Sequence, residues 1–167
     1  MPLNKQDLAA SLSKFMDPDS EGFEGSPENV EEFADKFSKA INDYAASVKP
    51  PTEPNTLSAA TAALKTALMG VGDPGEGKQL FNIVITAAMA AFGTAVGTGM
   101  GLASNGANVA APPTDPLGVD IAANVFIPGM LGAPASVCVE EMAATIDGWF
   151  KTGKVTIPGA PGPTPWK

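Results

Sequence analysis

The sequence contains neither arginine nor histidine, and its ten basic residues, all lysine, stand against 18 acidic ones in 167 positions. Arginine supplies bidentate contacts to phosphates and bases, and histidine supplies most acid–base chemistry and zinc ligation. The net charge of −8 also has the wrong sign for the phosphate backbone of nucleic acid. These absences exclude catalytic triads of the Ser-His-Asp and Cys-His kinds, and we expect no nucleic-acid partner.

Cysteine is nearly absent as well, since Cys138 stands alone and has no partner for an internal disulfide. Its neighbours Val137 and Val139 are apolar, so we expect a buried structural thiol and no reactive thiolate. Lys5 and Asp7 precede any apolar run, and no signal peptide is predicted. We therefore expect synthesis in a cytoplasm.

Charge is missing from the long stretch between Gln79 and Thr114. Its periodic apolar residues predict a helix over about 79–98 that is apolar nearly all round, which is typical of the centre of a bundle or of a bilayer. The stretch is mostly alanine, glycine and threonine and contains Asn82, so a buried central helix is favoured over a membrane span. A membrane-active protein that inserts segment 79–102 remains the alternative.

Apolar residues at helical spacing predict further helices on both sides of this segment. The first runs from Lys5 to Met16 with Asn4 as its cap, and a second begins after Ser26 with Pro27 in its first turn. Residues 56–69 and 135–150 show the same periodicity. The fold class expected is mainly α: one domain over 1–153, a small bundle of about four to five helices.

Glycine and proline dominate the rest of the chain. The connection 99–118 is too long for a turn, and residues 154–167 form a predicted extended C-terminal arm. Val155 and Ile157 lie in a short strand-like segment, and Trp166 is the one large apolar residue near the end. Because such an arm buries no core by itself, we expect these three residues to contact a neighbouring subunit, and deletion of Gly159–Lys167 to weaken assembly without harming the fold.

The segment GVGDPGEGK at 70–78 resembles the glycine-lysine loop that holds phosphates. Such a loop needs a strand before it and a hydroxyl after its lysine, but a helical pattern precedes this one and Gln79 follows Lys78. Asp73 and Glu76 would also repel phosphate. The glycines are better explained as a helix-breaking loop between two antiparallel helices.

The acidic segment DPDSEGFEGSPE at 17–28 is the sequence's weak candidate for a calcium site. Asp17, Asp19, Glu21 and Glu28 stand at positions one, three, five and twelve of a calcium-binding loop, with Gly22 at its turn. Glu24 occupies a position that such loops give to an apolar residue, and no second loop is present to pair with this one. The alternative is a solvated acidic turn before a capped helix.

Two segments near the ends of the chain resemble each other: DKFSKAINDY at 35–44 and EEMAATIDGW at 140–149. Both run into a valine-bearing stretch and a proline, which fits either two similar bundle helices or an internal duplication. No nucleophile stands beside a base, and the adjacent carboxylates Glu31-Glu32 and Glu140-Glu141 point apart on a helix. An enzyme is not predicted.

The units AINDY and TIDGWFKTGKVTI, with the uncharged middle and the proline-rich end, resemble small structural proteins of tailed bacteriophages. The resemblance covers the two end helices and the tail. It implies a non-enzymatic virion component at a connector, tail or baseplate position. Its partners would be other structural proteins of the same particle and further copies of itself in a ring.

Overall fold

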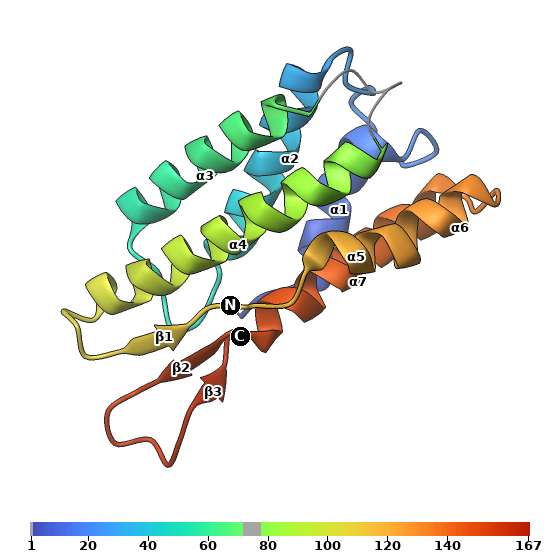
Figure 1. The fold of residues 1–167 in the computed structure, drawn as a ribbon. Coiled ribbons are helices and arrows are strands. Elements are labelled where there is room, and N and C mark those ends of the chain that lie inside the picture. Colours follow the sequence, from blue (N-terminus) through green and yellow to red (C-terminus); the bar gives the residue numbers. More distant parts are fainter. Residues whose placement is uncertain (1, 72–77) are drawn as a thin grey trace.

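The computed structural model of the chain describes residues 2–71 and 78–167 and is mainly helical with one small sheet (Figure 1). The helical elements are α1 (Lys5–Met16), α2 (Val30–Ala45), α3 (Pro54–Met69), α4 (Lys78–Ala103), α5 (Leu117–Ile121), the π-helical turn η1 (Ala122–Phe126), α6 (Ile127–Met130) and α7 (Ala135–Thr152). The strands are β1 (Val109–Ala111), β2 (Lys154–Thr156) and β3 (Thr164–Pro165). The mainly helical fold class is confirmed, and the fold carries a small sheet where one terminal strand was expected.

The helices form two groups around a common core (Figure 1). In the first group α3 packs between α2 and α4, and in the second α1 and the stretch from α5 to α6 lie along α7. The antiparallel sheet has the order β1-β2-β3 and lies where α4 and α7 end. One continuous core therefore includes residues from both helix groups and from the sheet.

Local capping explains where the first two helices begin. Asn4 accepts a hydrogen bond from the Gln6 N–H, as the sequence predicts for α1. The start of α2 lies later than predicted, because Asn29 and not Ser26 is its cap. The Asn29 side chain accepts from the Glu32 N–H while the Glu32 carboxylate accepts from the Glu28 N–H, a reciprocal arrangement that also lowers the pKa of Glu32.

The central helix α4 extends to Ala103 and not to about residue 98. Its last turns contain several glycines, which weaken an isolated helix. Here the glycines allow close packing, since Gly97 lies against Ala110 and Trp166, and Met100 is fully buried. The connection that follows is also structured, because β1 pairs with β2 through Val109 opposite Thr156.

Aromatic side chains form two groups within the core. We call the first the Phe cluster; it lies around the start of α4 and consists of Phe15, Phe33, Phe37, Phe81 and Phe126. We call the second the Trp cluster; it lies nearer the sheet and consists of Tyr44, Phe92, Trp149, Phe150 and Trp166. Ring centroids in the two clusters are 5.2 to 6.4 Å apart, a spacing at which edge-to-face pairs are favourable.

Candidate functional site

The acidic loop does not bring its four candidate calcium ligands together. Asp17 follows α1 as its C-cap, and its carboxylate accepts the Asp19 N–H at 3.2 Å. Among the described residues, no three acidic, histidine or cysteine side chains lie close enough to hold a metal ion. Asp17, Asp19, Glu21 and Glu28 thus surround a turn, and this geometry does not support the calcium hypothesis.

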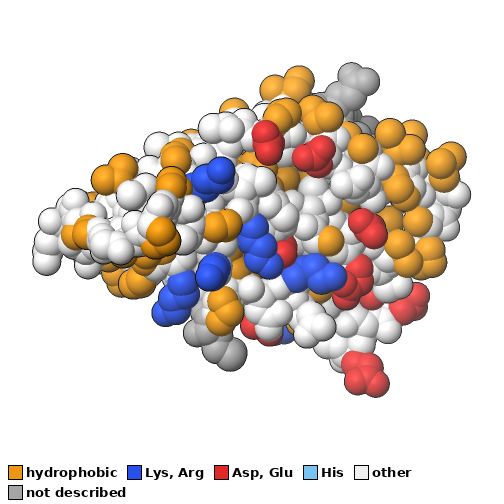
Figure 2. All heavy atoms as spheres, turned by 90° about the horizontal axis from the view of Figure 1, so that it is seen from below, with side chains coloured by type: hydrophobic (Ala, Val, Ile, Leu, Met, Phe, Trp, Pro, Cys, Tyr) orange, Lys and Arg blue, Asp and Glu red, His pale blue; other side chains and the backbone are white. Residues whose placement is uncertain are grey.

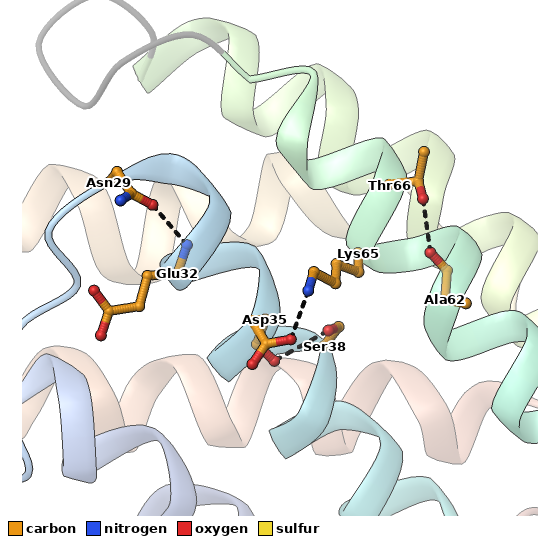
Figure 3. Close-up of polar contacts among 7 residues, drawn as sticks. All are labelled: Asn29, Glu32, Asp35, Ser38, Ala62, Lys65 and Thr66. Carbon is orange, nitrogen blue, oxygen red and sulfur yellow. Dashed lines mark hydrogen bonds and ion pairs between the residues drawn. The ribbon is translucent and has the colours of Figure 1, made fainter.

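The glycine-lysine segment lies largely outside the described residues, since 72–77 are not among them. A shallow polar groove of about 370 Å³ does lie between α2 and α3. Lys65 donates to the Asp35 carboxylate at 2.7 Å across the groove, and Ser38 donates to the Asp35 carbonyl (Figure 3). The bond to Asp35 raises the pKa of Lys65, and the ion pair links α2 to α3.

One carboxylate is buried beneath the Trp cluster. The Tyr44 hydroxyl donates to one Asp147 oxygen at 2.6 Å, and the Lys151 ammonium donates to the other at 2.7 Å. Burial and the neighbouring carboxylate raise the pKa of Tyr44 far above its ordinary value of 10.0. Both carboxylate oxygens are therefore satisfied, and the phenol stays protonated as a link between α2 and α7.

The C-terminal segment folds back on its own chain and is not the extended arm toward a neighbour that the sequence predicts. Val155 is buried within β2, which is paired on both sides and has no edge to offer a neighbour. Trp166 is fully buried, and its indole N–H donates to the Lys154 carbonyl at 3.1 Å. The segment folds back because Gly153 leaves room for the indole and Lys49 pairs with Lys167 through both backbone groups. Of the three predicted contact residues, only Ile157 is exposed.

Within the described residues, α4 contains the one helix segment long and apolar enough to cross a membrane, Phe81–Ala103, with a mean hydropathy of 1.6. Half of its most apolar window is buried inside the fold. Gly93 lies against Trp149 and Gly97 lies against Trp166, so these glycines leave room for the two indole rings. The packing of α4 accounts for the apolar residues on its buried side, whereas Ile83 and Leu102 on the same helix are exposed.

A surface that sequence reasoning missed lies at the far end of the molecule from the sheet (Figure 1). The stretch from α5 to α6 and the start of α7 form a helical hairpin that exposes large apolar side chains. We call this surface the apolar hairpin; it consists of Val119, Ile127, Met130, Leu131 and Val137. Leu131 is 84 % exposed and Met130 is 69 % exposed, although side chains of this kind are usually covered.

The tip of the apolar hairpin is well ordered by its own backbone hydrogen bonds. The Ala133 N–H bonds the Pro128 carbonyl at 3.0 Å, and the Gly132 N–H bonds the Gly129 carbonyl at 3.2 Å. Gly132 has a φ of 93°, so this is a Schellman motif with glycine at the left-handed position. Met130 and Leu131 are consequently held outward on a defined turn. The sequence signal was a pair of large apolar residues between two turn glycines.

On one face of the molecule, acidic and basic side chains lie in different regions. Figure 2 shows acidic side chains and many hydrophobic ones toward the end that carries α6, while lysines lie nearer the middle and the sheet. No known protein-family model, curated protein or solved structure matches the chain. The apolar hairpin is the candidate functional site, and the chemistry it offers is noncovalent docking.

Proposed function

We propose that this chain is a non-enzymatic structural component of a particle, of the tailed-bacteriophage kind that the sequence resembles, and that it docks on its neighbours through the apolar hairpin. The observation that carries the proposal is the exposure of Ile127, Met130 and Leu131 on one ordered turn. Contiguous exposed apolar surface on a soluble domain marks an interaction site. Covering these side chains with a partner surface is favourable, because it removes apolar area from water.

The polar contacts elsewhere in the fold are consistent with a structural function. In the α2–α3 groove and around Asp147, the polar side chains bond one another and link pairs of helices. The proposal places the protein in the virion after synthesis in the host cytoplasm. The proposed contact with a neighbour is through the apolar hairpin and not through a C-terminal arm, because Trp166 is buried in the core.

Incorporation into particles tests the proposal. We expect mass spectrometry to find the chain in purified virions, and a Met130→Asp/Leu131→Asp variant to be lost from them. Thr66→Asp is the matched control, because it adds a charge to an exposed position of α3 away from the hairpin. Normal incorporation of the hairpin variant contradicts the proposal.

Membrane insertion is the second candidate function, favoured by the length and hydropathy of Phe81–Ala103. Insertion of this helix would remove Phe92, Val96 and Met100 from the core. Co-sedimentation with lipid vesicles distinguishes the two functions. The assembly proposal expects the chain to stay in the supernatant, and the membrane proposal expects it in the vesicle pellet.

A further inference from the structure

The segment that forms the apolar hairpin carries acidic residues and no basic ones. Between Gln79 and Asp147 the chain carries Asp115, Asp120, Glu140, Glu141 and Asp147 and not a single lysine. Asp120 and both glutamates are exposed on the helices that form the hairpin, and only Glu140 has a lysine within 4 Å, Lys5 at 3.9 Å, among the described residues. A surface that covers the hairpin therefore needs apolar side chains with a basic rim.

The sheet end of the same chain carries basic residues that can form such a rim. The residues from Gly148 to Lys167 include Lys151, Lys154 and Lys167 and no acidic residue. Lys154 and Lys167 are exposed, as is Lys49, whose backbone pairs with that of Lys167. None of these three ammonium groups makes an ion pair in the part of the chain that the structure describes.

The outward face of the sheet supplies the apolar part. Ala110 and Val155 are paired and turned toward the core, so the side chains on either side of them along each strand point outward. We call this outward surface the sheet face; it consists of Val109, Ala111, Lys154, Thr156 and Pro165. Val109 lies on the edge strand β1 and is 68 % exposed.

The sheet face and the apolar hairpin lie at opposite ends of the molecule (Figure 1). We propose that the apolar hairpin of one copy docks on the sheet face of a second copy, with Asp120, Glu140 and Glu141 against the lysine rim. Two different surfaces on opposite ends give a head-to-tail contact that repeats, so the copies form a ring when the rotation closes and a filament when it does not. This inference rests on the proposed function and names the partner of the same site.

Electrostatics favour this orientation of the two copies over others. The net charge of −8 repels copies at long range, so the least repelled approach brings the acidic end of one to the basic end of the other. Contact between two hairpins would place like charges together, and an anionic lipid surface would repel the acidic rim. The charges therefore favour a second copy, bound head to tail, as the partner of the apolar hairpin.

A mixing experiment tests the inference. The hairpin variant Met130→Asp/Leu131→Asp and the sheet variant Val109→Asp/Lys154→Glu each lose one surface and keep the other. Masses from sedimentation velocity are expected to show oligomers for the wild type and monomers for each variant alone. The mixture is expected to form a dimer that does not extend, since one intact hairpin meets one intact sheet face. Thr66→Asp is expected to assemble like the wild type.

Several outcomes would overturn the inference. A wild type that is monomeric at every concentration, a sheet variant that still assembles, or a mixture that stays monomeric each contradicts head-to-tail contact. If the sheet variant assembles normally and the hairpin variant is still lost from virions, this inference fails and the proposed function stands. If the hairpin variant enters virions normally, the proposed function itself fails.

A charge exchange provides an independent check that does not depend on the aspartate variants folding. Glu140→Lys/Glu141→Lys and Lys154→Glu/Lys167→Glu change only exposed side chains. Each exchange alone is expected to weaken association at least tenfold, and a mixture of the two is expected to recover part of the loss. Equal association of all four samples would contradict the pairing of these rims.

Discussion

The two ends of this molecule are both rich in glycine and proline, but they treat their large apolar side chains in opposite ways. At the sheet end Trp166 is fully buried, and Gly153 and Gly97 provide the space for its indole ring. At the hairpin end Leu131 remains 84 % exposed on a turn of similar composition. The large apolar side chain at the sheet end is therefore part of the core, whereas those at the hairpin end are left exposed to solvent.

Loss of the buried tryptophan is the strongest test of the sheet end. Trp166→Ala removes a fully buried indole and its bond to the Lys154 carbonyl, so we expect a loss of about 3–5 kcal/mol in the free energy of unfolding. Chemical denaturation measures the loss, and Pro163→Ala, at an exposed position of the same segment, is the control. Deletion of Gly159–Lys167 is expected to destabilise the fold likewise. Unchanged stability in both would mean that the segment is a free arm after all.

A smaller loss of stability is expected when the space beside the Trp166 indole is filled. A Cβ atom at Gly153 would lie 2.6 Å from the Trp166 ring, so Gly153→Ala is expected to cost about 1–3 kcal/mol. Gly148 lies on α7 with nothing within 4 Å of an added Cβ, and Gly148→Ala is expected to stabilise the helix by about 0.5–1 kcal/mol. Thermal denaturation of the two variants should shift in opposite directions. Shifts of the same sign would contradict the close packing at Gly153.

Removal of the Tyr44 hydroxyl tests the buried link between α2 and α7. Tyr44→Phe keeps the ring against Phe150 but deprives Asp147 of one hydrogen bond, so we expect a loss of about 1–2 kcal/mol. Asp147 retains Lys151, which limits the cost. Equilibrium unfolding at neutral pH measures it, and a Tyr44→Phe variant as stable as the wild type would show that the hydroxyl contributes nothing.

The same residue gives the fold a defined response to alkali. Because the pKa of Tyr44 is raised in the folded state, its contribution to stability is full below the ordinary value of 10.0 and is lost as the pH rises above that value. Tyr44 is the chain's one tyrosine, so tyrosinate absorbance follows it directly. We expect tyrosinate to form together with the loss of helical circular dichroism. Tyrosinate that forms while the helices persist would contradict the burial of the hydroxyl.

The smallest effect on stability is expected at the hairpin end. Leu131→Ser replaces a side chain that already lies in water, so the free energy of unfolding should change by less than about 0.5 kcal/mol. The same denaturation experiment as for Trp166→Ala provides the contrast between the two ends. A loss of several kcal/mol at Leu131 would mean that this residue is part of the chain's own core.

Sequence periodicity was sufficient to show where the long helices lie, but not for all of their ends or for the way the two ends of the molecule pack. The Asn4 cap and the spacing of Leu8, Leu12 and Phe15 are local signals, and α1 was correctly predicted. The start of α2 was wrong because Ser26 and Asn29 are both good caps, and only the bond between Glu32 and Glu28 selects the second. The end of α4 was wrong because local propensity omits the packing of its glycines.

The pair of large apolar residues between Gly129 and Gly132 indicates a turn, but no local pattern shows that the turn is exposed. Whether Trp166 faces solvent or the core depends on Gly153 and Lys49, which are distant in sequence. The exposure of Leu131 depends on which face of the stretch from α5 to α6 lies against α7, and the π-helical turn at Ala122–Phe126 shifts that face. Both are long-range consequences of packing. The calcium pattern is also a local signal, and among the described residues its spacing does not bring three carboxylates together.

Photo-crosslinking from position 131 tests the central claim most directly, in an equal mixture of isotopically light and heavy copies. A photoreactive residue in place of Leu131 is expected to link to Val109–Ala111 or to Lys154–Thr156 of a second copy, which mass spectrometry recognises as a light–heavy pair. Links confined to the same copy, to a second hairpin or to lipid would contradict the account.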